Sequence, residues 1–96
     1  MARMRLKVSI THYPLGEGGQ DTPLHSVLNF QSRYMSGSSP VYIPHLFIAN
    51  AGETKITEVE PYNAKDFYRA MSGDRLYIIG FDRTINGEAT IMEVRR

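Results

Sequence analysis

The stretch MRLKVSITH, residues 4–12, is the clearest guide to the fold, because apolar and polar residues alternate along all of it. One side carries Met4, Leu6, Val8, Ile10 and His12, and the other side carries Arg5, Lys7, Ser9 and Thr11. A repeat of two residues is typical of a β-strand with one face on the core and one face in solvent. The stretch therefore predicts a half-buried strand near the start of the chain.

Two segments downstream carry the signals of helices. Thr22 is a suitable N-cap, and Pro23 fits the first helical position, where its missing N–H costs nothing. The apolar residues that follow at helical spacing are Leu24, Val27, Leu28, Tyr34 and Met35. Gly37 then supplies a stop signal. Asn63 is a second N-cap candidate, for a shorter helix over residues 64–71 that a Ser-Gly pair ends.

The segment after the first predicted helix has the composition of a hairpin. Residues 41–48 are rich in β-branched and aromatic side chains, and residues 54–60 resume an extended pattern after a turn at 50–53. Pro44 removes one donor from the ladder, so this strand is expected at a sheet edge or at a bulge.

A second hairpin is predicted at the C-terminus, where residues 75–84 and 89–94 flank the pair Asn86-Gly87, which favours a type I′ turn. The element order is then strand, helix, strand, strand, helix, strand, strand. This order predicts a single α+β domain over residues 1–96 with a ferredoxin-like split β-α-β arrangement: βαββαβ plus an extra C-terminal strand, an antiparallel sheet with two helices on one face.

Two of the predicted strands, residues 41–48 and 75–84, are apolar on both faces, so something must cover the second face. Three covers stay open: a partner subunit stacked sheet on sheet, the extra terminal strand folded over, or a closed barrel in place of an open sheet. Sheet stacking is a common way to bury such a face, so a homodimer is favoured. The side chains expected at the interface are Tyr42, Leu46, Ile48, Tyr77, Ile79 and Phe81.

Composition narrows the function classes. The chain has 11 Lys and Arg against 10 Asp and Glu, and a net charge of +1 creates no general attraction to nucleic acid or anionic membrane. The absence of Cys excludes thiolate nucleophiles and zinc–thiolate sites and fits a reducing compartment. No run approaches the roughly 18 apolar residues of a membrane span. We therefore expect a cytoplasmic protein, in its own cell or in a host cell, without a membrane, metal or cofactor partner.

One candidate ligand pocket follows from a glycine-rich loop, residues 16–19. The loop lies between a predicted strand and a predicted helix N-terminus, which is a place where backbone N–H groups hold phosphates. It lacks the Gly-Lys-Ser/Thr of a phosphate-binding loop, and Asp21 stands where the G-x-G-x-x-G fingerprint has its last glycine, so a flexible connector is the preferred interpretation. The candidate ligand-binding residues are Gly16, Gly18, Gly19, His12 and Asn50.

His12 and His25 are expected near this loop and could serve acid–base catalysis at neutral pH. Their spacing matches no metal motif, and a structural role is the preferred interpretation. No nucleophile elbow of the type G-x-S-x-G occurs, so the sequence assigns no catalytic residue.

Arg3, Arg5 and Lys7 could form a basic sheet surface for single-stranded nucleic acid. The strand expected beside them carries Glu58 and Glu60, which would repel phosphate, and it lacks the aromatic residues of an RNA-recognition motif. A solvated polar face is therefore preferred.

These observations favour a small non-catalytic binding protein that acts through protein–protein contacts, as an inhibitor, regulator or assembly subunit. Its size would suit a product of a phage or mobile element. Two alternatives stay open: a module that binds nucleotide or single-stranded nucleic acid through the Gly16–Gly19 loop or the Arg5 and Lys7 face, and a small acid–base enzyme that uses His12 and His25.

Overall fold

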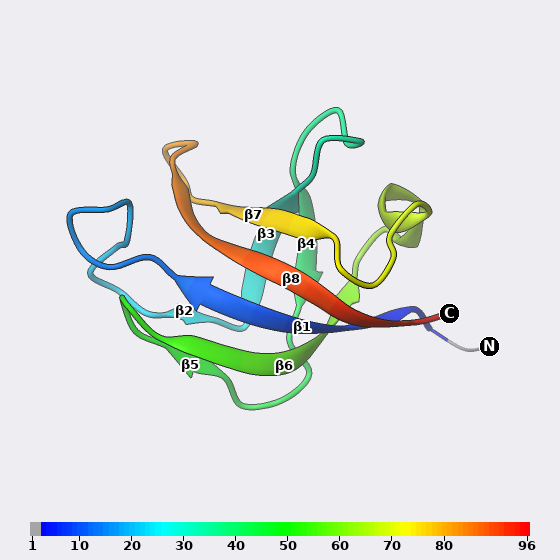
Figure 1. Ribbon diagram of the computed structural model, residues 1–96, viewed down its shortest axis with the longest axis horizontal. Coiled ribbons are helices and arrows are strands. Elements are labelled where there is room, and N and C mark those ends of the chain that lie inside the picture. The colour runs from blue at the N-terminus through cyan, green and yellow to red at the C-terminus, as the bar shows by residue number, and fades with distance from the viewer. Residues whose placement is uncertain (1–2) are drawn as a thin grey trace.

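Residues 3–96 are described by the computed structural model, and in this part of the chain the protein consists of β-strands and one short helical turn. The strands are β1 (Arg5–His12), β2 (Leu24–His25), β3 (Val27–Gln31), β4 (Ser39–Tyr42), β5 (Ile48–Ala49), β6 (Thr54–Pro61), β7 (Arg75–Ile79) and β8 (Ile85–Arg95), and the turn is η1 (Ala64–Phe67). Six strands close into an antiparallel barrel in the order β1-β6-β4-β3-β7-β8, with β8 pairing back to β1 (Figure 1). The predicted α+β ferredoxin-like fold with two helices is therefore wrong.

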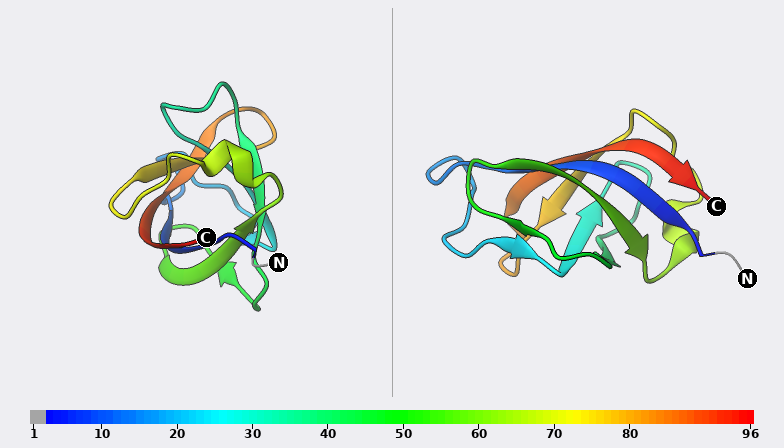
Figure 2. Two further views of the ribbon diagram at one scale, coloured as in Figure 1. Left: turned by 90° about the vertical axis from the view of Figure 1, so that its right-hand side faces the viewer. Right: turned by 90° about the horizontal axis from the view of Figure 1, so that it is seen from below.

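The barrel has Greek-key connectivity. Strands β3, β4 and β6 follow one another around the barrel, and β7 returns by a longer connection to lie beside β3. Strands β8 and β1 then complete the ring, which is seen in the left view of Figure 2. The short strands β2 and β5 pair only with each other, as a separate two-stranded ribbon. All six barrel strands therefore have a partner on each side.

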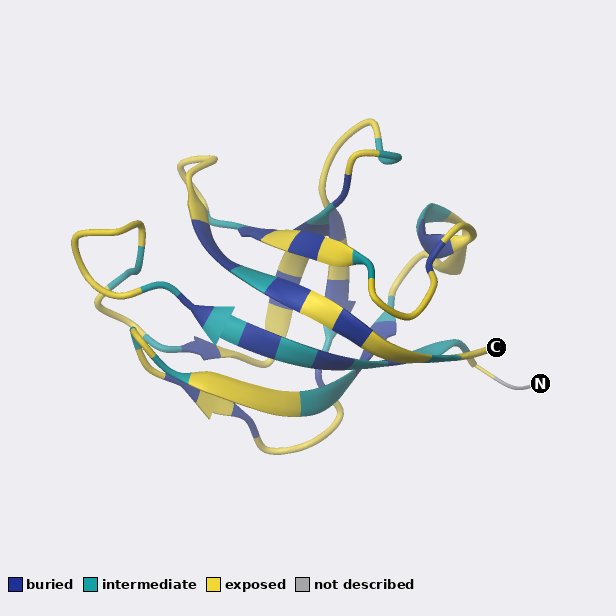
Figure 3. Ribbon diagram, viewed as in Figure 1, coloured by how far each residue is buried: buried dark blue, intermediate teal, exposed yellow. Residues whose placement is uncertain are grey.

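The strand predicted for residues 4–12 is confirmed as β1. Its inward residues Leu6, Val8 and Ile10 are fully buried, and they alternate with half-buried outward residues, as the banding in Figure 3 shows. The strand pairs with β6 on one side and β8 on the other. Its regular alternation of burial follows from this position, because one face meets the barrel core and the other meets solvent.

The helix predicted after Thr22 is wrong, because the segment forms β2 and β3. Ser26 between them has φ 54°, a left-handed conformation that interrupts a helix. In β3 burial alternates with a repeat of two: Leu28 and Phe30 are buried, whereas Val27 and Asn29 are exposed. Of the apolar residues that fit a helical face, only Leu28 lies on the buried side of this strand, and pairing with β4 and β7 selects the strand.

The second predicted helix is reduced to the single turn η1. Its expected cap is confirmed, because the Asn63 side chain accepts a hydrogen bond from the Lys65 N–H at 3.3 Å. Phe67 is fully buried and joins the core at the end of the barrel that carries the chain termini (Figure 1). Met71, which would share its face in a longer helix, is 63% exposed. A single buried side chain stabilises one helical turn, but it does not stabilise a longer amphipathic helix.

The turn predicted at Asn86-Gly87 is wrong, because both residues lie inside β8. Residues 80–84 make the reversal instead: the Gly80 N–H donates to the Thr84 carbonyl at 2.8 Å, and Arg83 adopts φ 64°. Pairing of β8 with both β1 and β7 outweighs the local preference of Asn-Gly for a turn.

Barrel closure accounts for the inward faces of the strands that are apolar on both sides. Val41 of β4 and Leu76 and Ile78 of β7 point into the core, whereas Tyr77 on the outward face of β7 is 39% exposed. The strand expected over residues 41–48 is interrupted around Pro44 and continues only as β5. One continuous core results, and its buried apolar members are Leu6, Val8, Ile10, Leu24, Leu28, Phe30, Val41, Ile43, Phe47, Ala49, Val59, Phe67, Ala70, Leu76, Ile78, Ala89 and Ile91.

Candidate functional site

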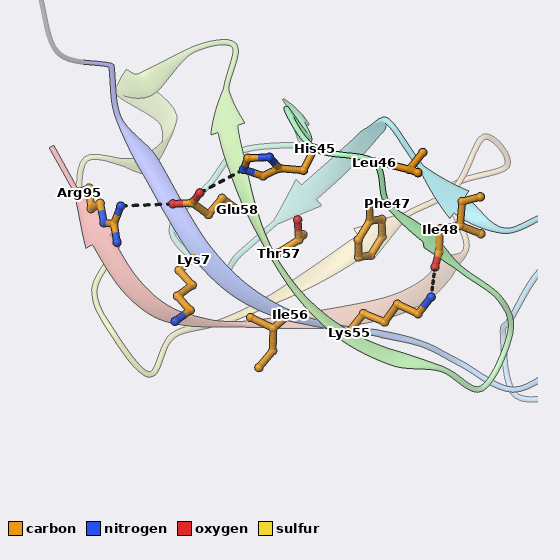
Figure 4. Close-up of a pocket in the computed structure, with 10 residues that line it drawn as sticks. All are labelled: Lys7, His45, Leu46, Phe47, Ile48, Lys55, Ile56, Thr57, Glu58 and Arg95. Carbon is orange, nitrogen blue, oxygen red and sulfur yellow. Dashed lines mark hydrogen bonds and ion pairs between the residues drawn. The ribbon is translucent and has the colours of Figure 1, made fainter.

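The strongest candidate site is a groove of about 570 Å³ between the β4–β5 loop and the outer side of β6 (Figure 4). The loop supplies His45 and Leu46, and β1 and β8 contribute one basic side chain each. The full lining is Lys7, His45, Leu46, Phe47, Ile48, Lys55, Ile56, Thr57, Glu58 and Arg95. We call it the Leu46 groove.

Apolar side chains are exposed on the Leu46 groove without a partner in the described chain. Phe47 is 7% exposed and belongs to the core, so it anchors the loop to the barrel. The residues on either side of it point the other way: Leu46 is 97% exposed and Ile48 is 46% exposed. Ile56 of β6, which is 58% exposed, faces the same groove. Several exposed apolar side chains around one groove are typical of interaction sites.

Charged groups frame the groove around one carboxylate. Glu58 lies 3.2 Å from His45 Nε2, 3.4 Å from the Arg95 guanidinium and 3.6 Å from the Arg5 guanidinium, so the two arginines neutralise it. The Lys55 ammonium donates to the Ile48 carbonyl at 2.6 Å, and this hydrogen bond holds the aliphatic part of the side chain against the groove. No carboxylate in residues 3–96 lies within 4.0 Å of this ammonium. The rim of the Leu46 groove is therefore basic.

The structure brings the predicted pocket residues together, but as a packed end of the barrel. His12 is fully buried, with Nδ1 2.9 Å from the Ala49 carbonyl oxygen and Nε2 accepting from the Gln20 N–H at 3.1 Å. Both ring nitrogens are thus engaged within the protein, and neither is free for a substrate proton. His25 is exposed, and its Nδ1 lies 3.1 Å from the Ser26 hydroxyl. The arrangement gives the acid–base hypothesis no support.

The glycine-rich loop is packed down on the same end. The Gly18 carbonyl accepts from the Asn86 side-chain amide at 2.9 Å, and a Cβ on Gly18 would lie 2.8 Å from the Ile85 carbonyl oxygen. Gly19 donates to the Pro14 carbonyl at 3.1 Å. The Asn50 N–H is likewise engaged, by the Glu53 carboxylate at 2.6 Å. These backbone donors and acceptors serve the turns themselves and do not converge on an open phosphate site.

The basic face of β1 is neutralised by β6. Arg5 lies 3.3 Å from Glu60, and the Tyr42 hydroxyl together with Arg5 holds the pKa of the Glu60 carboxyl below its usual range. Arg3 donates to the Tyr42 hydroxyl at 3.2 Å. Lys7 stands opposite Glu58 and Glu93 on the neighbouring strands. Acidic cross-strand partners therefore remove the continuous positive surface that a nucleic-acid strand would need.

The predicted interface residues do not share one surface. Leu46 and Ile48 lie on the Leu46 groove, Ile79 and Phe81 lie near the β7–β8 turn, and Tyr77 lines a different groove. Tyr42 packs against Tyr62, with ring centroids 5.3 Å apart. Ile56 and Lys55 were missed as site residues, because their place beside Leu46 depends on how the β4–β5 loop crosses β6. Sequence spacing carries no signal for that crossing.

Searches of protein-family models and of curated proteins find no match to the chain. Within residues 3–96, no three His, Cys, Asp or Glu side chains are grouped so as to hold a metal ion. The same residues contain no helix long and apolar enough to cross a membrane.

Proposed function

We propose that the protein is a small non-catalytic binding domain that docks a protein partner on the Leu46 groove. The observation that carries the proposal is the nearly complete exposure of Leu46 at a groove that the exposed Ile48 and Ile56 also line. Burying such side chains against a partner stabilises a complex by roughly 25 cal/mol per Å² of apolar surface removed from water. Inhibitors, regulators and assembly subunits act through contacts of this kind.

Charge at the rim indicates what the partner presents. Lys55 lines the groove with no carboxylate of residues 3–96 within 4.0 Å, whereas Lys7 stands opposite Glu58 and Glu93 on the neighbouring strands. A partner segment with an apolar anchor side chain flanked by carboxylates would match both features, because complementary charge assists encounter and orientation.

A different protein is favoured over a second copy of this chain. The homodimer was expected from sheet-on-sheet stacking of an open sheet, whereas the six strands close on one another and form their core within one chain. A second copy would also bring its own basic rim against this one, which electrostatic repulsion disfavours. A cytoplasmic location, in its own cell or in a host cell, remains part of the proposal and is compatible with a chain that has no Cys.

Site-specific photo-crosslinking tests the docking proposal. A crosslinking amino acid placed at Leu46 in the native cell should capture a defined partner, and the same amino acid at Leu15, which is 60% exposed in another loop, should not. With the captured partner purified, Leu46→Asp should weaken binding at least tenfold, about 1.4 kcal/mol, in calorimetric titration.

Matched variants separate the groove from general stickiness. Leu15→Asp adds the same charge at a similarly exposed leucine and should leave the partner's affinity unchanged. Identical crosslinks from positions 15 and 46, or an affinity that ignores Leu46→Asp, would contradict the proposal. A crosslinked species with the mass of two chains would assign the groove to self-association instead.

A further inference from the structure

A second groove, of about 630 Å³, lies between the turn after β3 and the segment that joins η1 to β7. It is separate from the Leu46 groove and shares no lining residue with it. Its lining is Ser32, Arg33, Tyr34, Arg69, Met71, Gly73, Asp74, Arg75 and Tyr77. We call it the arginine groove.

Positive charge in the arginine groove exceeds negative charge. No carboxylate in residues 3–96 lies within 4.0 Å of the guanidinium of Arg33 or Arg69, whereas Arg75 pairs with Glu88 at 3.1 Å. The Asp74 carboxylate accepts a hydrogen bond from the Met71 N–H at 3.0 Å, which spreads part of its charge onto the backbone. Arg33 and Arg69 therefore line the groove without an acidic partner within the described residues.

Two hydroxyl groups lie under the surface of this groove. The Ser32 and Tyr34 hydroxyl oxygens are buried, and within the described residues neither has a hydrogen-bond partner other than its neighbour in this pair. Burial raises the pKa of the Tyr34 phenol, the Ser32 hydroxyl opposes the rise, and the Asp74 carboxylate adds to it. The phenol is therefore a proton donor at neutral pH.

The groove has an aromatic surface and a rigid wall. Tyr77 of β7 is 39% exposed and lines the groove, and Arg69 lies 5.9 Å from the centroid of the Tyr68 ring. The wall is tied to β8, because the Gly73 N–H donates to the Ile91 carbonyl at 2.7 Å and the Ile91 N–H donates to the Asp74 carbonyl at 2.8 Å. A site held in place before binding loses less entropy when the ligand arrives.

We propose that the arginine groove binds a nucleotide, with Arg33 and Arg69 holding the phosphate and the ring of Tyr77 stacking on the base. Guanidinium groups match phosphate oxygens in pairs, and tyrosine rings are common stacking surfaces for bases. The groove volume falls within the roughly 300–1,000 Å³ of ligand pockets. A free mononucleotide and one residue of a single strand offer the same chemistry, so the experiment distinguishes these sources.

Fluorescence anisotropy on the full chain tests the assignment. The probe is a labelled oligothymidine of about eight nucleotides, within the usual site sizes for single strands. Unlabelled thymidine monophosphate and inorganic phosphate serve as competitors. The double variant Arg33→Ala/Arg69→Ala should weaken probe binding about tenfold or more. It should also reduce the slope of log affinity against log salt by about 0.7 for each phosphate that the protein no longer neutralises.

Two further variants make the result specific. Tyr77→Ala should weaken the oligothymidine and the monophosphate while leaving competition by inorganic phosphate unchanged. Arg83→Gly is the matched control: it removes one arginine from the β7–β8 turn, where φ 64° suits glycine, and it should not change the affinity. Circular dichroism and the thermal midpoint check that each variant folds.

The possible outcomes separate clearly. An oligothymidine that binds at least about tenfold more tightly than the monophosphate identifies a single strand as the ligand, and equal affinities identify a free nucleotide. The proposal is overturned by a failure of every probe to bind, by equal losses in Arg83→Gly and the folded double variant, or by binding of inorganic phosphate alone. None of these results depends on whether the Leu46 groove binds a protein.

Discussion

The imidazole of His12 joins three segments at one end of the barrel. Its Nδ1 lies 2.9 Å from the Ala49 carbonyl, its Nε2 accepts from the Gln20 N–H at 3.1 Å, and its backbone N–H donates to the Glu53 carbonyl at 2.9 Å. These partners assign the neutral tautomer with the proton on Nδ1. His12→Ala would leave a cavity and two unpaired backbone groups, so we expect a loss of about 3 kcal/mol in the free energy of unfolding, measured by urea denaturation.

His25→Ala is the control at the residue scale. The His25 side chain is exposed, and its one hydrogen bond within the described residues is to the neighbouring Ser26 hydroxyl, so its loss should change the free energy of unfolding by less than about 0.5 kcal/mol. Equal and small effects of the two substitutions would mean that the barrel end does not depend on His12.

At the scale of elements, β8 contains a glycine that the ladder requires. Gly87 pairs with His12 on one side and Ile78 on the other, and a Cβ there would collide with the Thr11 carbonyl and lie 3.3 Å from the His12 Cα. We expect Gly87→Ala to lower the free energy of unfolding by about 2 kcal/mol, because the backbone of β1 would have to move. Gly37→Ala, with no atom within 4 Å of its added Cβ, should be neutral or slightly stabilising. Similar urea midpoints for both variants would contradict the position of Gly87 inside β8.

The sequence predicted an element correctly where its local pattern fits only one conformation. The two-residue repeat of residues 4–12 fits a strand and not a helix, and the Asn63 cap joins residues that are close in the chain. Leu28 and Phe30, in contrast, satisfy a strand whose partners lie far along the chain, while the surrounding apolar residues also fit a helical face. Asn86-Gly87 carries a turn preference that two flanking strands override. Local signals fail where distant pairing decides between two conformations.

Some residues of the candidate site could be selected from the sequence, and others could not. Leu46 and Ile48 could be selected from sequence, because the chain there has more apolar residues than one buried face needs. Ile56 and Lys55 could not be selected from sequence, because their place in the groove depends on how the β4–β5 loop crosses β6. The same holds for Arg33 and Arg69, which lie 36 positions apart in the chain and meet in one groove.

For the whole molecule, closure of the barrel changes the partner that is expected. An open sheet with two apolar faces needs a second sheet, whereas a closed barrel buries its core within one chain and leaves no strand edge of the ring unpaired. The exposed features include an apolar groove and a separate arginine groove. The proposed protein partner and the proposed nucleotide would therefore bind at different surfaces.

Acid should destabilise the whole molecule through its carboxylates. Neighbouring donors and cations hold the pKa of Glu60 below its usual value, and those of the exposed Asp82 and Glu93 are also lowered. A carboxyl with a lower pKa in the folded state binds fewer protons there than in the unfolded chain. Its stabilising contribution is therefore complete above the unfolded value, about 4 for Asp and Glu, and is lost as pH falls through the folded value.

Urea denaturation at pH 7, 5, 4 and 3 measures this decline and the share of it that Glu60 carries. Glu60 is nearly buried beside Tyr42 and Arg5, so Glu60→Gln should lower the free energy of unfolding at pH 7 and make its decline between pH 5 and 3 shallower. The decline should not vanish, because Asp82 and Glu93 still titrate. Glu17→Gln, in an exposed loop, should follow the parent profile. A Glu60→Gln profile parallel to the parent's at every pH would mean that proton uptake at Glu60 does not contribute to acid unfolding.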